Sequence, residues 1–235
     1  MKKNIDEMTE FDYAQYLDYA VLKPDLTLTE LKEAITLGVL YQCRSICVNP
    51  GAVDLTKQLT KDSNTKVCVV LDFPFGTSDT KSKVEQAKII LEKGNIFEID
   101  MVANYGLIKS GEKELVTADI EAVSDICHQY GVGLKVILET DALTREEISL
   151  GISCAIAANA DFVKTSTGFY MAETIVGASP EIITFMLQET NGKIKVKGSG
   201  CIRTRERMLE LISLGVDRLG IGYTSVQNLI DKERL

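Results

Sequence analysis

Two lysines lie in apolar, β-branched segments that end in hydroxyl and glycine residues. Lys164 lies in the segment DFVKTSTG (161–168), and Lys197 lies in IKVKGSG (194–200). A strand that is buried on both faces has a near-continuous apolar sequence. A charged lysine inside such a strand is costly unless it is paired, solvated at the strand end or deprotonated. The two segments therefore indicate amine chemistry.

A lysine nucleophile needs an environment that favours its neutral form. An ordinary lysine has a pKa of about 10.4, so only about one in 2,500 is neutral at pH 7. Burial and a neighbouring cation both favour the neutral amine. Lys135, Lys164 and Lys197 come from three successive predicted strands, and Asp100 comes from the strand before them. We interpret this set as a nucleophilic lysine with a cationic helper and a carboxylate that handles protons; structural ion pairs are the alternative.

Glycine-bearing turns after the late strands indicate an anion site. They are the segments TSTG (165–168), GSG (198–200) and GIG (220–222). Backbone N–H groups in such turns bind phosphate after the seventh and eighth strands of many barrels. A glycine after a strand is usually only a tight turn. The interpretation as an anion site therefore depends on the fact that the last two of these turns follow the last two predicted strands.

These residues must be positioned by strands that alternate with helices. We predict eight strands, separated by roughly 25 to 35 residues, which is the length of a βα unit. They span 19–22, 45–48, 67–71, 97–101, 134–138, 162–165, 194–197 and 218–220. The pattern predicts an α/β protein, a (β/α)₈ barrel forming a single domain over residues 1–235. An open doubly wound sheet is the alternative, but no G-x-G-x-x-G follows the first strand.

Helix signals fill the segments between these strands. An apolar face spans 83–93 and stops at a glycine, a capping box begins at Thr144, and Ser179 precedes a proline suited to a first helical turn. A further helix spans 204–214. We also expect an extra N-terminal helix over residues 6–17, at the bottom of the barrel.

Composition excludes several classes of function. The chain has 235 residues, 45% of them apolar, and a net charge of −8, which disfavours nucleic-acid and anionic-membrane partners. No stretch approaches the roughly 20 apolar residues of a membrane span. The six cysteines form no C-x-x-C pair, and the chain starts without a signal-like apolar run, so we expect a cytoplasmic protein. A single histidine, His128, gives little support for zinc or triad chemistry, and we expect no metal.

Several motifs resemble the deoxyribose-phosphate aldolase family, and together they cover the chain from Asp18 to about Gly222. The matching segments are LKP (22–24), ICVNP (46–50), FEIDMV (97–102), LKVILET (134–140), ADFVKTSTGF (160–169) and VKGSGCIRT (196–204). The resemblance implies a class I aldolase on a (β/α)₈ barrel that uses no metal or other cofactor. By the family pattern, Lys164 is the Schiff-base lysine, Lys197 is a second lysine that activates it and joins the proton relay, and Asp100 is the acid/base partner.

The implied reaction is the reversible cleavage of 2-deoxy-D-ribose 5-phosphate to acetaldehyde and D-glyceraldehyde 3-phosphate. The partner is thus a small sugar phosphate or aldehyde, and a homodimer or homotetramer is compatible with the family. We expect substrate contacts from Cys47, Lys135, Thr165, Gly168, Ser199, Gly200, Cys201, Gly220 and Gly222.

The chain departs from the family pattern at three places near the substrate. Tyr19 and Ala20 stand where the family usually has histidine and a hydroxyl residue, and Cys201 stands at a usual glycine. Gly222 and Tyr223 replace a serine and a small residue, and the chain ends at Leu235 without the C-terminal tyrosine of some members. The alternatives are an aldolase for a different or unphosphorylated aldehyde, a barrel that binds sugar phosphates without catalysis, and another lyase or isomerase of phosphorylated keto sugars.

Overall fold

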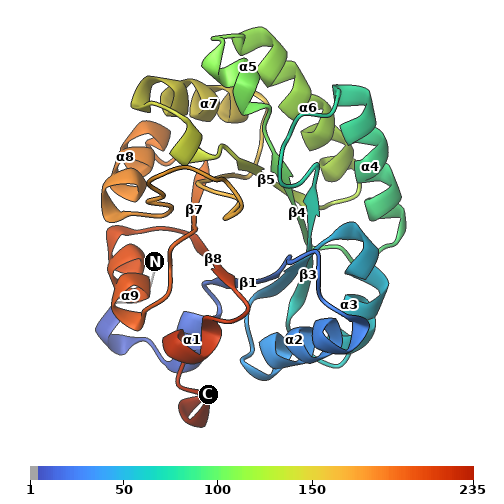
Figure 1. Cartoon of the computed structure of the whole chain (residues 1–235), viewed down its shortest axis with the longest axis vertical. Coiled ribbons are helices and arrows are strands. Elements are labelled where there is room, and N and C mark those ends of the chain that lie inside the picture. Colours follow the sequence, from blue (N-terminus) through green and yellow to red (C-terminus); the bar gives the residue numbers. More distant parts are fainter. Residues whose placement is uncertain (1–4) are drawn as a thin grey trace.

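Eight parallel strands close into a barrel, and helices surround it (Figure 1). The computed structural model describes residues 5–235. The strands are β1 (Leu17–Val21), β2 (Ser45–Val48), β3 (Lys66–Leu71), β4 (Glu98–Val102), β5 (Gly133–Ile137), β6 (Phe162–Lys164), β7 (Lys195–Ser199) and β8 (Arg218–Gly222). β8 closes on β1, with Asp18 opposite Gly220. The predicted (β/α)₈ barrel is confirmed, and the open doubly wound sheet is wrong.

Most of the helices begin at residues whose side chains cap them. The α-helices are α1 (Glu10–Ala14), α2 (Leu28–Leu40), α3 (Val53–Thr60), α4 (Thr80–Glu92), α5 (Tyr105–Lys109), α6 (Lys113–Gln129), α7 (Arg145–Ala157), α8 (Pro180–Thr190), α9 (Arg205–Leu214) and α10 (Val226–Leu229). Of these, α3, α6 and α10 start without a side-chain cap. Short 3₁₀ helices are η1 (Ile5–Glu7), η2 (Pro50–Ala52), η3 (Thr140–Ala142) and η4 (Lys232–Arg234). Thr144 and Glu147 form the predicted capping box of α7, and Ser179 caps α8. Within residues 5–235, no helix is both long and apolar enough to cross a membrane.

The N-terminal segment is more broken than the single helix we predicted over 6–17. η1 is followed by Thr9, which forms a capping box with Asp12 and starts the five-residue α1. Leu17 already belongs to β1. The carbonyl of Ala14 accepts a hydrogen bond from the backbone N–H of Arg44, just before β2, so the segment lies at the N-terminal ends of the strands.

Strand limits match the prediction for β2 and differ by one or two residues elsewhere, and three differences bear on function. β8 continues through Gly222 rather than ending at Gly220, so the predicted turn at 220–222 lies within the strand. β1 begins at Leu17 rather than Tyr19, which places Asp18 inside the strand. β7 continues through Ser199 rather than ending at Lys197. There the Thr165 hydroxyl substitutes for backbone pairing, because it donates to the Ser199 carbonyl at 2.7 Å and accepts from the Ser199 N–H at 2.8 Å.

The two faces of the strands differ sharply in chemistry. Residues that face the helices are apolar and form one continuous core, which includes Tyr19, Ile46, Val69, Met101 and Val196. Because side chains alternate along a strand, the intervening residues face the barrel interior. Most barrels fill that interior with branched apolar residues. Here it holds acidic and basic side chains that are almost wholly buried, namely Asp18, Glu98, Asp100, Lys135, Lys164, Lys197 and Arg218.

Candidate active site

A cavity of about 330 Å³ opens at the carboxyl ends of the strands, the end at which barrel enzymes carry their active sites. Lys164 and Lys197 both line it. Among the predicted substrate contacts, seven residues line it as well: Cys47, Gly168, Ser199, Gly200, Cys201, Gly220 and Gly222. The cavity therefore joins the lysines of the barrel interior to the turns of the late βα loops.

Lys164 is the least constrained lysine of the interior. It ends β6, and its Nζ lies 2.9 Å from Oδ2 of Asp100, which is the one carboxylate in ion-pair contact with it among the described residues. Its side chain keeps 5% of its surface exposed, whereas that of Lys135 keeps none. Lys164 thus combines a single tether with access to the cavity, which is what an attacking amine requires.

Lys197 contacts two carboxylates. Its Nζ lies 2.6 Å from Oδ2 of Asp18 and 2.8 Å from Oδ2 of Asp100. Burial alone would lower the pKa of Lys197, but the charges of Asp100 and Asp18 raise it above its ordinary value. Lys197 is therefore a fixed cation beside the cavity, and it shares the Oδ2 atom of Asp100 with Lys164.

Asp100 is the common acceptor of the site. Its Oδ1 accepts from Nζ of Lys135 at 2.9 Å and from the Cys68 thiol at 3.3 Å, while its Oδ2 accepts from Lys164 and Lys197. Burial would raise the pKa of Asp100, but the three lysines hold it well below its usual range. Asp100 is thus a permanent carboxylate beneath the two cavity lysines.

A lower layer of charges completes this network. Lys135 contacts Glu98, Asp100 and Asp18 at 2.5, 2.9 and 3.4 Å, and Arg218 contacts Asp18 at 2.8 Å and Glu98 at 3.3 Å. The network thus links four cationic side chains with three carboxylates. Its positive charges therefore exceed its negative charges by one, and Lys164 is a cationic member that reaches the cavity.

Two of the predicted substrate contacts lie away from the cavity. Lys135 is completely buried beneath Asp100, within the ion-pair network. Thr165 is also completely buried, and its hydroxyl is used to hold β7. Both side chains support the site from below or behind, and the cavity lining does not include them.

Asp18, Glu98 and Arg218 are members of the network that the sequence interpretation did not single out. A usable signal was present, because Glu98 and Asp100 are two residues apart and so share one face of their strand. For Asp18 the signal was hidden by the predicted start of β1 at Tyr19. A charged residue at the first position of a strand usually lies in solvent, so Arg218 gave no signal in the sequence. In the structure, Arg218 is only 6% exposed.

The substituted residues after Asp18 divide between the two faces of β1. Tyr19 is completely buried in the outer core, where a Cβ on Gly38 would lie 2.5 Å from its ring. Ala20 lines the cavity. Tyr19 therefore affects packing against α2. Ala20 places a small apolar side chain at the cavity wall, where the family usually has a hydroxyl residue.

The outer end of the cavity is formed by loops. Cys201 is exposed and has φ = 60°, in the left-handed region. Tyr223 is half-buried, and Nζ of Lys23 lies 5.9 Å from the centre of its ring. Arg203 also lines this end. Two basic side chains and an aromatic ring thus surround the turns in which we expect an anion.

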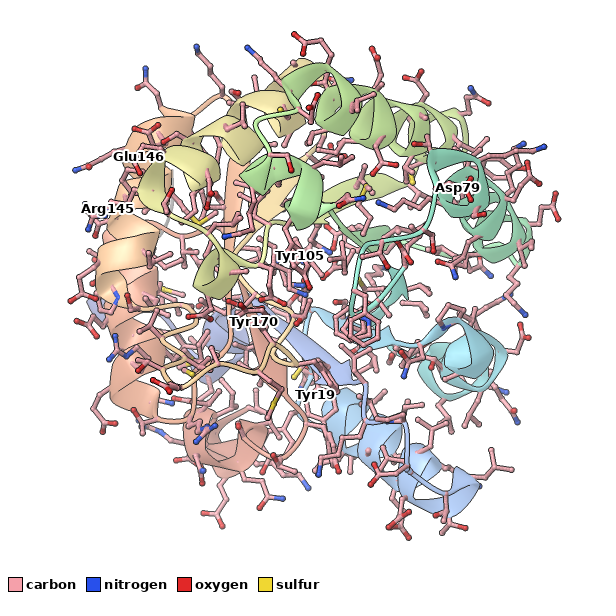
Figure 2. All side chains as sticks on the ribbon, turned by 45° about the horizontal axis from the view of Figure 1, so that its top comes forward. Tyr19, Asp79, Tyr105, Arg145, Glu146 and Tyr170 are labelled. Carbon is pink, nitrogen blue, oxygen red and sulfur yellow. The ribbon has the colours of Figure 1, made fainter. Side chains whose placement is uncertain are left out.

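The β6–α8 loop (165–179) covers one side of the cavity through contacts with the β5–α7 loop. Glu139 accepts hydrogen bonds from the backbone and hydroxyl of Thr167, and Asp141 accepts from the N–H groups of Val176 and Gly177. Tyr170 meets the ring of Tyr105 edge-on, with centroids 6.5 Å apart (Figure 2). Side chains from the β5–α7 loop and from the start of α5 therefore position this loop.

One group of side chains has the donor types of a metal site. The potential ligand atoms of Cys47, Cys68 and Asp100 lie within 4.8 Å of one another. The Asp100 oxygens already accept from three lysines, and these cations oppose a further positive charge beside them. We assign no metal to it.

The closed barrel with a lysine-bearing cavity at the carboxyl ends of its strands defines a barrel enzyme whose chemistry centres on an amine. The family model described as DeoC/LacD family aldolase matches residues 6–225, and the chain belongs to this family.

Curated relatives and solved structures agree with this assignment. The chain is 39% identical over 208 residues to a deoxyribose-phosphate aldolase of Thermoanaerobacter pseudethanolicus, covering 88% of this chain and 91% of the relative. It is 40% identical to that of Treponema denticola, covering 88% and 93%. A putative deoxyribose-phosphate aldolase from Coccidioides immitis superposes with a TM-score of 0.87 at 32% identity, covering 96% of this chain and 87% of the other.

Proposed function

We propose that this protein is a class I aldolase that reversibly cleaves 2-deoxy-D-ribose 5-phosphate to acetaldehyde and D-glyceraldehyde 3-phosphate through a Schiff base on Lys164. The observation that carries the proposal is the placement of Lys164, which reaches the cavity while a single carboxylate holds it. The relatives' names supply the substrate class.

The chemistry begins with a neutral Lys164. Its Nζ attacks C1 of the open-chain aldehyde, and loss of water gives an iminium ion. A base removes the proton of the C3 hydroxyl, the C2–C3 bond breaks, and its electron pair moves into the iminium to form an enamine. Glyceraldehyde 3-phosphate leaves, C2 is then protonated, and water hydrolyses the new iminium to release acetaldehyde and restore the amine.

Asp100 and Lys197 are suited to the proton transfers of this cycle. Asp100 contacts both cavity lysines and stays ionised, so it stabilises the positive charge that appears on the Lys164 nitrogen. Lys197 lines the cavity as a protonated amine and can donate a hydrogen bond to the carbonyl oxygen or to a water molecule there. We propose that Lys197 and such a water molecule carry protons to and from the substrate, while Asp100 holds the two lysine nitrogens in position.

The loop end of the cavity would hold the phosphate. Lys23 and Arg203 supply positive charge, and the turn at Gly200–Cys201 supplies backbone N–H groups. A chain with a net charge of −8 needs such local groups to attract an anion. Cys201 and Tyr223 lie among these groups, so they narrow the space available to the phosphate.

Borohydride trapping tests this function. Reduction in the presence of deoxyribose 5-phosphate or acetaldehyde should attach a stable adduct to Lys164, located by peptide mass mapping. Lys164→Met should abolish the adduct, whereas Lys23→Met, which removes a cavity lysine outside the ion-pair network, should still be trapped. An adduct on another lysine, or none under conditions of turnover, would refute the mechanism.

A retro-aldol assay that compares deoxyribose 5-phosphate with free deoxyribose tests the substrate. We expect a higher kcat/KM for the phosphorylated sugar. The opposite preference would indicate an aldolase for unphosphorylated aldehydes, the alternative that Cys201 and Tyr223 favour.

We further propose that the whole chain is one aldolase domain that works in the cytoplasm as a homo-oligomer. The family match spans nearly the full length, and all six cysteines are free, as is typical of a reducing compartment. A tetramer is described for the deoxyribose-phosphate aldolase of Aeropyrum pernix, which superposes with a TM-score of 0.85 at 26% identity. Light scattering during size-exclusion chromatography measures the oligomeric state.

A further inference from the structure

Two cysteines inside the barrel are direct neighbours across adjacent strands. Cys47 of β2 and Cys68 of β3 are partners in the parallel register, and both side chains face the interior. Neighbouring strands lie about 4.8 Å apart, which falls within the roughly 4.4–6.8 Å between Cα atoms that a disulfide requires. Their sulfur atoms lie within 4.8 Å of each other. The backbone therefore already holds the pair at bonding range.

The two thiols differ in access and in reactivity. Cys47 lines the cavity, whereas Cys68 is completely buried behind it. Contact with the Cys68 thiol lowers the pKa of Cys47 in spite of its burial, while burial raises the pKa of Cys68. The thiol that meets solvent-borne reagents is thus the one that ionises more readily, and the thiolate is the reactive form.

Cys68 is also connected to the amine chemistry. Its Sγ donates to Oδ1 of Asp100 at 3.3 Å and lies 3.5 Å from Nζ of Lys135. Asp100 is the acceptor shared by Lys164 and Lys197. A change at the Cys68 sulfur therefore reaches, through one contact, the carboxylate that holds both cavity lysines.

We propose that Cys47 and Cys68 form an oxidative modification site, in which a peroxide converts the two thiols to a disulfide and switches the cavity lysines off. The part that concerns activity rests on the proposed aldolase function; the bond itself does not.

The chemical steps balance with one peroxide molecule. The Cys47 thiolate attacks one peroxide oxygen, the O–O bond breaks, and hydroxide leaves to become water, giving a sulfenic acid on Cys47. The Cys68 sulfur then attacks the Cys47 sulfur, and the departing hydroxide takes the Cys68 proton as a second water. The two thiols together lose two electrons and two protons. Asp100 loses its hydrogen bond from Cys68, and the ion-pair geometry around it changes.

Peroxide treatment of the purified full-length protein tests the proposal with two independent measurements. Non-reducing peptide mapping should reveal a Cys47–Cys68 linked peptide, with the loss of two hydrogen masses. The retro-aldol rate should fall in step with that peptide, by about 10²-fold, as expected when reacting groups are misplaced by about 1 Å. Dithiothreitol should restore both. Peptide mapping needs no substrate, so it tests the disulfide even if the protein is not an aldolase.

Two variants sharpen the result. Cys68→Ser lacks the second sulfur, so its Cys47 sulfenic acid should proceed to sulfinic acid and lose activity irreversibly. Cys154→Ser alters a cysteine that bonds to the Lys113 carbonyl outside the barrel, and should retain the linked peptide and the reversible loss. Circular dichroism checks that Cys68→Ser folds. Unlinked Cys47 and Cys68 in inactivated wild type, full activity in the linked protein, or full recovery of oxidised Cys68→Ser would each overturn the proposal.

Discussion

The two ends of the cavity are constructed in different ways. At the strand end, charged side chains project from strands and hold one another, so that Asp100 contacts three lysines and Asp18 contacts Lys197, Lys135 and Arg218. At the loop end, Cys201 is exposed on a bend and Gly222 is exposed at the last position of β8. Rigid strands therefore carry the groups to which we assign the reaction, and loops carry the groups to which we assign substrate discrimination.

The difference also separates stability from specificity. Removing one partner of a buried ion pair leaves an uncompensated charge and costs about 3–5 kcal/mol. Most surface changes alter stability by no more than about 0.5 kcal/mol. Substitutions at the strand end should thus change rate and folding together, and those at the loop end should change substrate binding. Lys164 should be an exception, because its replacement should change rate without changing stability. It contacts one carboxylate among the described residues, that of Asp100, and it belongs to a network in which positive charges outnumber negative ones.

Replacing Lys164 tests that exception and should give the largest effect on rate. Lys164→Met keeps most of the side chain but removes the nucleophile, so we expect kcat/KM to fall by about 10⁴-fold or more, or about 5.4 kcal/mol at 1.36 kcal/mol per tenfold change. Loss of one surplus cation should leave the thermal midpoint close to that of wild type. A retro-aldol rate within tenfold of wild type would contradict the assigned role.

Replacing Asp100 should damage both properties at once. Asp100→Asn is nearly isosteric but leaves three lysines without their shared carboxylate, so we expect the free energy of unfolding to fall by about 3–5 kcal/mol. We expect kcat/KM to fall by about 10²- to 10³-fold, as for lost electrostatic stabilisation in an active site. Urea unfolding and steady-state kinetics measure the two effects. An unchanged urea midpoint would show that the network is not a source of stability.

The network also predicts a flat region in the dependence of stability on pH. The lysines hold the pKa of Asp100 well below its ordinary value, so its stabilisation is present above the unfolded pKa of about 3.9 and is lost as the pH falls through the folded pKa. Burial lowers the pKa of Lys135, but Asp100 and Asp18 raise it well above its ordinary value. That stabilisation is present below about pH 10.4 and is lost as the pH rises through the folded pKa.

Denaturant titrations of wild type and Lys135→Met across this range measure the effect. We expect the difference in stability between them to stay constant from about pH 5 to pH 9 and to shrink above about pH 10.4. A difference that grows at alkaline pH would mean that Lys135 is not held as a cation.

The strand end was largely predictable from the sequence, since lysines inside β-branched segments are rare enough to mark Lys164 and Lys197. The alternation of side chains also puts Asp100 on the interior face. The partners of these residues depend on barrel closure, which no local pattern encodes. Asp18 and Lys197 are 179 positions apart and meet because β8 and β7 return to β1. Lys135 was misplaced at the cavity for the same reason, because its depth depends on strand register.

The loop end was predictable only as a set of turns. Gly200 and Cys201 mark a bend, but the sequence does not reveal that Gly177 comes so close that a Cβ on it would lie 2.6 Å from the Gly200 carbonyl. Nor does it reveal the left-handed backbone of Cys201. Loop conformations depend on neighbours from other βα units, so their details appear only once the barrel is assembled.

That left-handed cysteine gives the smallest and most local test of the comparison. Cys201 has φ = 60°, which costs a residue with a Cβ about 1–2 kcal/mol. Cys201→Gly removes this strain. It also makes the unfolded chain more flexible, which lowers the free energy of unfolding by about 0.4–1 kcal/mol. We therefore expect the free energy of unfolding to rise by about 0.5 kcal/mol in total. Gln42→Gly, at an exposed residue with φ = 49° outside the cavity, should give a similar gain. Only Cys201→Gly should also change KM for deoxyribose 5-phosphate, and by a larger factor than kcat. Equal changes in KM for the two variants, measured beside their urea midpoints, would show that the loop end does not distinguish substrates.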